Sequence, residues 1–340
     1  MNVSERAIHL GLLVTALAAA GWAFGSHGHP PRSPSSTSVA TKTAPTAPLS
    51  LIPPGSAFVL TADVRKLEHA PLGVLLAQRL SHVGGATQLA TSCGFEPLAR
   101  LDQLALAVPG ATLEAQEHPE DFGIVASGRF SAEEIMHCAS AVIAARHGEP
   151  IRTQLGSFSS VRDRTHSGGE VAARDGGLLL VSDGSYLRAL LDAAEGNAPK
   201  LERPEARDAR HSALRRALGP APLLATWLLG EGWFERVAGD ANNARLSPLG
   251  ALLAVGARVD AGNAVHVSVL LECTDSDGAA RISSLLGELR SSLNALPVDP
   301  AVATVARRIA VSQTGARLTL SLDLETSELQ PLLDLLLGPA

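Results

Sequence analysis

One short segment of the sequence gathers residue types that bind metals, EEIMHC at residues 133–138. Residues four apart share a helix face, so Glu133 and His137 could ligate one ion. Glu134 follows Ser131 by three positions, which is the spacing of a capping box at a helix start. A zinc site needs three or four protein ligands, and the sequence places no third ligand beside this pair. We therefore interpret the segment as a solvated helix face and predict no metal and no cofactor.

The three cysteines permit one disulfide. Cys93, Cys138 and Cys273 are too few and too far apart in the sequence for a CxxC-type zinc site. In an oxidising compartment Cys93 and Cys138 could pair, which would leave Cys273 over. Alternatively Cys138, three positions after Ile135 on an apolar stripe, is an ordinary buried thiol. The sequence leaves both readings open.

Motifs of several enzyme classes are absent. The sequence has no GxSxG elbow, no GxxxxGK[ST] phosphate loop, no GxGxxG and no HExxH. The serine hydrolases, nucleotide enzymes and metalloproteases that use these motifs are therefore not indicated. An active site without a motif, such as a carboxylate pair, stays open. We predict no catalytic residue and favour a protein that is not an enzyme.

Apolar patterning predicts an α+β body in two similar units with mostly antiparallel sheets. Unit one opens with a strand at 56–64 and a helical pattern over 67–80, and unit two opens with a strand at 223–229. In each unit a helix follows the third strand, and a hairpin precedes a closing helix. Both units are βαββαβ-like, and we expect their helices on one face. The other expected strands are 101–110, 121–130, 151–161, 170–174 and 178–182 in unit one, and 249–259, 264–272, 307–312 and 317–324 in unit two.

The closing helices carry the clearest internal repeat, because LRALLDAAEG at 187–196 resembles LQPLLDLLLG at 329–338. We expect both helices to pack on their sheets in the same way, with Leu190 and Leu332 in equivalent buried positions. A second match, APLGVLLA at 70–77 with SPLGALLA at 247–254, has a different offset. The residues identical in the closing helices are Leu187, Leu190, Leu191, Asp192 and Gly196, which match Leu329, Leu332, Leu333, Asp334 and Gly338.

Composition argues against nucleic-acid binding. The net charge is −6 and aromatic residues make up 3% of the chain, so basic and stacking surfaces are both scarce. The basic segment at 202–216 alternates in charge and is interpreted as a solvated connecting helix. Trp227, Trp233 and Phe234 concentrate aromatic side chains near the start of unit two, where we expect them in the core rather than in a recognition patch.

The first 50 residues predict export. Residues 7–24 are apolar except for His9 and Thr15, and as a helix they would span about 27 Å, close to the thickness of a membrane core. A cleavable signal peptide fits the same segment, and we favour the uncleaved anchor. The composition of the Pro/Ser/Thr-rich segment 26–50 predicts a disordered linker, in which we expect His27 and His29 to be solvated.

The segments LIPPGSAFVLTADV, GEVAARDGGLLLVSDGSYLRALLDAAEG and RHSALRRALGPAPLLATWLL resemble a broad group of bacterial exported proteins of unknown function. The resemblance covers most of residues 51–230. It implies export and a repeated α+β body, and it assigns no catalytic or binding residue.

Together these observations predict a single-pass protein of the bacterial inner membrane with its body in the periplasm, or a secreted protein if the N-terminal segment is cleaved. Its function would be that of a non-enzymatic, membrane-tethered binding module for another envelope protein. The alternatives are an exported, hydrolase-like enzyme and a carrier of an apolar ligand between the units. The predicted segments are the anchor or signal at 1–25, the linker at 26–50, unit one at 51–200, a connector helix at 201–220 and unit two at 221–340.

Overall fold

The computed structural model describes residues 47–82, 86–110, 122–165, 169–182, 184–197, 206–230, 232–234, 246–292 and 300–337. The predicted membrane segment and most of the predicted linker, with His27 and His29, lie outside these residues. Within them, no helix has the length and apolarity needed to span a membrane.

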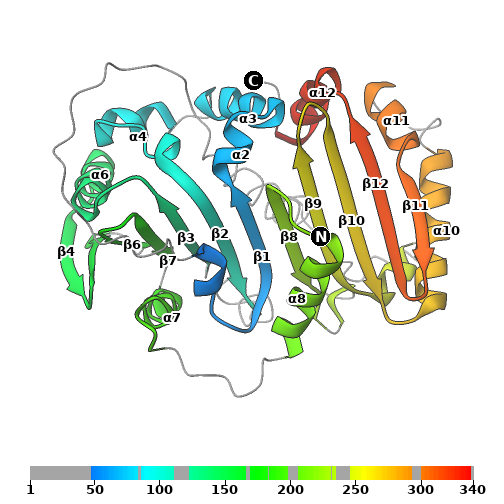
Figure 1. Cartoon of the computed structure of the whole chain (residues 1–340), viewed down its shortest axis with the longest axis horizontal. Helices are drawn as coiled ribbons and strands as arrows, with labels where there is room; N and C mark the ends of the chain where they lie inside the picture. Colours follow the sequence, from blue (N-terminus) through cyan, green and yellow to red (C-terminus); the bar gives the residue numbers. More distant parts are fainter. Residues whose placement is uncertain are drawn as a thin grey trace.

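Twelve strands of the described chain form one sheet in which all neighbours are antiparallel (Figure 1). This confirms the predicted α+β class. Strand 151–161 was expected to be continuous, but it is two strands, because a turn at Gly156 reverses the chain. The strands are β1 (Ser56–Asp63), β2 (Leu101–Pro109), β3 (Gly123–Gly128), β4 (Pro150–Leu155), β5 (Phe158–Asp163), β6 (Glu170–Arg174), β7 (Leu178–Ser182), β8 (Leu223–Leu228), β9 (Leu252–Ala261), β10 (Val265–Cys273), β11 (Ala310–Thr314) and β12 (Arg317–Leu324).

Strand order is the same in both units when each is followed outward from the centre. Unit one runs β1-β2-β3-β7-β6 and then adds β5 and β4, while unit two runs β8-β9-β10-β12-β11. The units meet where β1 pairs with β8, with Leu60 opposite Ala225. The first strands of two similar units are thus joined edge to edge into one sheet.

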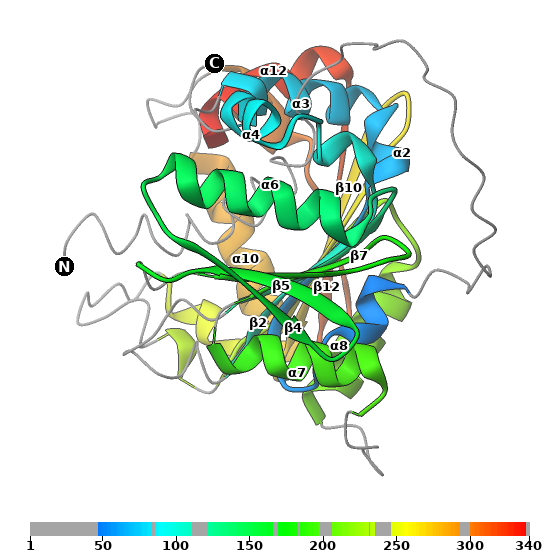
Figure 2. The same ribbon diagram turned by 90° about the vertical axis from the view of Figure 1, so that its left-hand side faces the viewer.

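Helices lie on both faces of the sheet, and not on one face as expected. We name the faces after helices: α7 (Gly184–Glu195) and α8 (Ala206–Leu218) lie on the α8 face, and α6 (Ala132–Ala145) lies on the opposite, α6 face (Figure 2). The α6 face also carries α2 (Val64–Glu68), α3 (Pro71–His82), α10 (Ser276–Ser292) and α12 (Thr326–Leu337). The remaining helical segments are η2 (Pro48–Leu51), α4 (Ala86–Cys93), η3 (Leu98–Arg100), η4 (Ser247–Ala251) and α11 (Pro300–Arg307).

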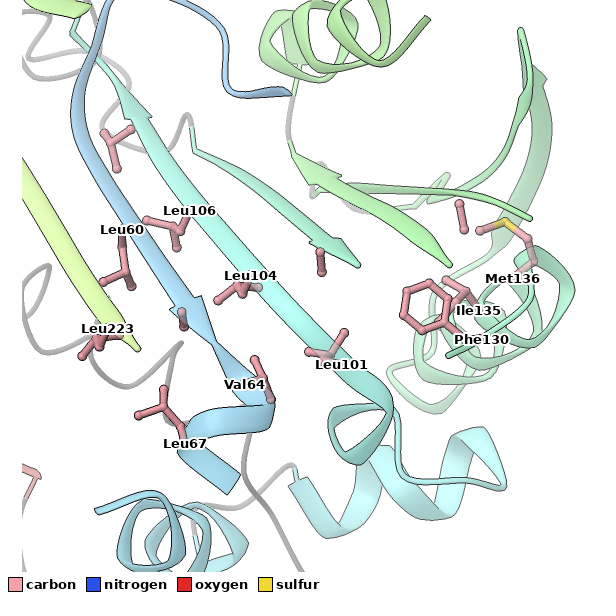
Figure 3. Packing of buried hydrophobic residues seen from close by; sticks show 14 of the residues in the cluster. Leu60, Val64, Leu67, Leu101, Leu104, Leu106, Phe130, Ile135, Met136 and Leu223 are labelled. Atoms are coloured by element: carbon pink, nitrogen blue, oxygen red, sulfur yellow. The ribbon is translucent and has the colours of Figure 1, made fainter. Parts of the chain in front are cut away.

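The largest core cluster lies on the α6 face and crosses the junction of the units. Leu60 of β1 and Leu104 of β2 pack in one cluster with Leu223 of β8, beneath Leu67 of α2 (Figure 3). These four side chains are at most 6% exposed. The junction is therefore filled by leucines on this face, because period-2 alternation aims every second residue of each strand at the same layer.

Several local predictions are confirmed. Ser131 and Glu134 form the capping box of α6, in which each side chain bonds the other residue's backbone N–H. Gly176 and Gly177 turn between β6 and β7 with positive φ, which glycine adopts at no steric cost. The predicted linker ended at residue 50, but Pro48 and Leu51 are buried on the body in η2, so the body begins earlier.

The predicted connecting helix is α8, and one of its faces is buried on the sheet, whereas the sequence predicted a solvated helix. Leu214 and His211 of α8 are buried, and α8 packs on β8, β9 and β1. Gly256 of β9 permits this approach, because a Cβ there would overlap the Leu218 side chain. The helix thus covers the junction of the units on the α8 face.

The two closing helices lie on opposite faces, which corrects the prediction of equivalent packing. On the α8 face, α7 buries Leu187 and Leu190 against β3 and β7. On the α6 face, α12 buries Leu329, with Leu332 half-buried, against β10, β12 and α3. The PLG segments of the second repeat also differ, since one starts α3 and the other forms η4.

Candidate functional site

The α8 face of unit two carries a broad polar surface. On β10 and β12 the polar side chains on this face alternate with the apolar ones that point to the α6 face. The exception is Leu270 of β10, which lies on the α8 face and is buried against α8. In the described chain no helix covers β12 or β11 on this side (Figure 1), and α8 reaches β10 at this leucine. We call this surface the polar patch; it consists of Arg258, Asp260, His266, Ser268, Glu272, Ser312, Thr314, Arg317, Thr319, Ser321 and Asp323.

Charged side chains mark the two ends of the polar patch. At one end Asp260, His266 and Asp323 lie opposite one another on three neighbouring strands. The Nδ1 atom of His266 is 2.7 Å from an oxygen of Asp323. At the other end Glu272 lies opposite Arg317, with 3.9 Å between the charged atoms. These pairs are partly exposed, so each contributes little to stability, about 0 to 1 kcal/mol.

Hydroxyl groups occupy the middle of the polar patch. Ser268 lies opposite Ser321, and Thr319 lies opposite Ser312 in the next row. Each hydroxyl both donates and accepts hydrogen bonds. The patch therefore offers a strip of hydroxyls between two charged ends.

Serine, histidine and aspartate side chains share this face, which raises the question of a hydrolase. In a catalytic relay one ring nitrogen of the histidine contacts the carboxylate and the other contacts the nucleophile. In the part of the chain that the structure describes, the side-chain hydrogen bond of His266 goes to Asp323. The group as it stands is an ion-pairing row on an open sheet, and it provides no assembled nucleophile.

A second polar group is buried where the units meet under α8. The ring nitrogens of His211 lie 2.7 Å from the Thr226 hydroxyl and 2.9 Å from the Ser56 carbonyl. The ring N–H at Nε2 donates to that carbonyl. The Tyr186 hydroxyl lies 3.3 Å from the Ser56 hydroxyl, and Gly123 makes room for the tyrosine ring. Burial and the nearby carboxylate Asp208 raise the pKa of Tyr186 to about 12.

Arg215 lies at the same junction of the two units, about one helical turn after His211 on α8. Its Nη2 donates to the Thr61 hydroxyl, and its Nη1 is buried without a partner among the described residues. Burial lowers the pKa of Arg215 to about 10. His211 is buried and its two hydrogen bonds join β1 of unit one to β8 of unit two, while Arg215 is half-buried.

The candidate metal-ligating and disulfide residues named from the sequence do not come together in one site. Cys93 and Cys138 form a disulfide that joins α4 to α6, and Cys273 is buried and free. Glu133 forms an ion pair with Arg152, so it lies on a solvated helix face. The described residues contain no group of three or more metal-ligating side chains in reach of one ion.

The aromatic residues near the start of unit two are partly buried. Trp233 donates a hydrogen bond to the Leu252 carbonyl and contacts the Phe234 ring edge-on. It also packs against the core cluster that contains Ile282 of α10. Trp227 is half-buried on the α6 face of β8. They belong to the body of unit two and not to the polar patch.

The polar patch was not predicted as a site, although its signal is present. RLTLSLDL in β12 alternates polar and apolar residues, and HVSVLLE in β10 does so except at Leu270, which predicts a mainly polar face on each strand. Register between the strands brings these polar residues together, and register cannot be read from either strand alone.

Comparison with known proteins identifies the fold only. No protein family and no curated protein matches the sequence. Among solved structures, crystal form III of TP0453 matches with a TM-score of 0.51 and 13% identity, covering 84% of this chain and 97% of that one. Crystal form I of TP0453 gives 0.47 and 12%, covering 86% and 98%. The chain therefore shares an α+β fold with TP0453, and this level of identity transfers no residue role.

Proposed function

We propose that this protein is a non-enzymatic binding module of the bacterial cell envelope, tethered to the inner membrane and exposed to the periplasm, which holds another envelope protein on the polar patch. The observation that carries the proposal is the difference between the two units on the α8 face. In unit one, β7 presents Leu178 and Leu180 there, and α7 covers them. In unit two, β12 presents Arg317, Thr319 and Ser321 to the same face, and no helix of the described chain covers them.

The chemistry of the polar patch favours a protein partner. Its two arginines, Arg258 and Arg317, lie among three acids, Asp260, Glu272 and Asp323. Such a surface offers no excess positive charge to a phosphate backbone or to anionic lipid. The hydroxyl strip between the charges matches the mixed hydrogen-bonding groups of a protein surface.

The N-terminal sequence supports the location. Residues 7–24 would hold the protein in the membrane, and the segment 26–46 would separate the body from it. As an extended Pro-rich chain at about 3.1 Å per residue, that segment would reach about 65 Å. The tether thus gives the body access to partners well away from the membrane surface.

Site-specific photo-crosslinking tests the proposal. A photoreactive phenylalanine analogue is placed at Ser268 or Ser321 of the full chain in intact cells, with Gln154 as a control that is exposed on β4 of unit one. We expect one discrete adduct with another envelope protein from both patch positions and none from the control. No adduct at either patch position, or the same adduct at position 154, would contradict the proposal.

A second variant separates the polar patch from its surroundings. Arginine at both Ser268 and Ser321 would fill the hydroxyl strip with charge while leaving the α6 face intact. We expect this double variant to lose the adduct formed from a third patch position, Thr319. Retention of that adduct would show that the partner binds elsewhere.

A further inference from the structure

The outer edge of unit two is open where the matching edge of unit one is paired. The fifth strand from the centre is equivalent in the two units: it is β6 in unit one and β11 in unit two. The outer edge of β6 pairs with β5, with Ser160 opposite Ala172 and Val161 opposite Val171. Between α10 and β11, unit two has the helix α11, which packs on α12. No described strand therefore pairs with the outer edge of β11.

Protection against edge pairing differs between the two ends of the sheet. The outermost strand of unit one, β4, carries Pro150 and also Arg152, which pairs with Glu133. Prolines and charges on an edge strand hinder the addition of another strand. The five residues of β11, Ala310–Thr314, include no proline and no charged residue, and all five are exposed. The β11 edge is thus the unprotected end of the sheet.

Apolar side chains lie beside this open edge. Val311 of β11 is 36% exposed and points to the α6 face, where α10 lies. Leu289 of α10 is 39% exposed, and the next residue, Arg290, reaches the Ile309 carbonyl just before β11. Two of the large apolar side chains that the described surface exposes therefore lie on the two elements, β11 and α10, at this end of the sheet.

We propose that β11 is a self-association edge, at which a second copy of this chain adds its own β11 in antiparallel register about a two-fold axis at Ser312. In this register Val311 faces Gln313 of the second copy and Ala310 faces Thr314 of the second copy. The strand is complementary to itself, because no charged side chains are brought opposite each other. The sheet then continues through both copies.

The mode of pairing has a precedent within the chain. At the centre of the sheet β1 and β8, which are equivalent edge strands of the two units, pair antiparallel over five residues of each strand, from Phe58 opposite Trp227 to Ala62 opposite Leu223. The β11 strand has the same length, five residues. An antiparallel pair of identical strands also closes as a two-fold dimer and cannot grow into a filament.

The helix α10 borders this edge on the α6 face (Figure 1). It contacts β11, β12 and β10, and both of its ends bond to the β11 segment, where Arg290 donates to the Ile309 carbonyl and Gln313 donates to the Ser276 carbonyl. In the proposed pairing the two α10 helices therefore lie next to each other on the same face of the sheet, with the exposed Leu289 side chains near the axis.

Cysteine cross-linking tests the register directly. In the full chain in native membranes, Ser312→Cys places two thiols opposite each other across the axis. We expect mild oxidation to give a species of twice the chain mass, with a cross-linked fraction at least tenfold above that of Thr153→Cys on the β4 edge. Thr314→Cys serves as the register control, because it faces Ala310 of the second copy and should not cross-link with itself. Equal cross-linking at positions 312 and 153, or preferential cross-linking at 314, would overturn the proposal.

A second experiment measures the association of two copies without an engineered disulfide. The mass of the purified full chain, corrected for bound detergent, should be that of two copies, and Val311→Lys should reduce it to one. Val311 is exposed, so a circular dichroism spectrum equal to that of the unmodified chain is expected for the variant. A mass of one copy for the unmodified chain at about 100 μM would overturn the proposal, as would cross-linking of Ser312→Cys to a different protein.

Discussion

Leu190 and Leu332 hold matching positions in the two copies of the closing-helix sequence, yet they lie on opposite faces of one sheet. The reason is in the strands on which the helices pack. The α8 face of β7 offers Leu178 and Leu180, while the α8 face of β12 offers polar residues such as Ser321. The α12 helix buries its leucines where apolar surface exists, which leaves the polar patch open.

Truncation of these leucines should separate the two environments. Leu190→Ala removes a side chain with no exposed surface and should lower the free energy of unfolding by about 2 to 5 kcal/mol. Leu332→Ala affects a half-buried side chain and should lower it by less than about 2 kcal/mol. Denaturant melts measure both, with Leu329→Ala as the buried reference in α12 at 3% exposure. A silent Leu329→Ala beside a costly Leu332→Ala would mean that α12 presents another side to the sheet.

Arg215 should contribute nothing to stability, although its side chain is half-buried at the junction of the units. Its Nη1 has no described partner, and burial lowers the pKa of its guanidinium to about 10, so the charged form is disfavoured there. Arg215→Met keeps the apolar stem and removes the charge. We expect a free energy of unfolding equal to or above that of the unmodified protein.

Arg258 is the matched control for Arg215. It donates to the Asp260 carboxylate and to the Leu218 carbonyl at the end of α8. Since hydrogen bonds of charged groups contribute about 1.5 to 3 kcal/mol, Arg258→Met should lower the free energy of unfolding by about that amount. A larger loss for Arg215→Met than for Arg258→Met would contradict our account of the junction.

Removal of the Cys93–Cys138 disulfide should lower stability through the unfolded state. The bond closes a loop with a sequence separation of 45 residues. Chain-entropy arithmetic for a loop of this length gives about 3 to 4 kcal/mol. The double variant Cys93→Ser, Cys138→Ser should therefore unfold at lower denaturant concentration and be insensitive to reductant. If reductant leaves the melt of the unmodified protein unchanged, the bond does not contribute in this way.

The capping box of α6 should make stability depend on pH. The Ser131 N–H and then the Arg100 guanidinium lower the pKa of Glu134 from its ordinary value of 4.5. Because the folded-state pKa is the lower one, the stabilisation is present above about pH 4.5 and is lost as the pH falls through the folded-state value. Glu134→Gln should be less stable than the unmodified protein at pH 7 and approach it near pH 3. Two parallel stability curves between these pH values would contradict this.

Local structure was predictable where short-range chemistry decides it. The Ser131–Glu134 capping box, the Gly176–Gly177 turn and the alternation in β12 involve neighbours in sequence, and each is present in the structure. The repeat in the closing helices also predicted two similar units, and the order of strands is the same in both. These features follow from hydrogen bonds and periodicity that span only a few residues.

Only the tertiary structure determines which face of the sheet each helix covers and which residues distant in sequence contact each other. Nothing in the sequence of α8 shows that His211 reaches Ser56, which lies 155 residues earlier, because that contact depends on β1 pairing with β8. The polar patch likewise exists only because register places Ser268 of β10 opposite Ser321 of β12. The repeated sequence of the closing helices determined that each would be an amphipathic helix. Which face it covers was set by the apolar surface that distant strands supply, and that surface forms only when the sheet is assembled.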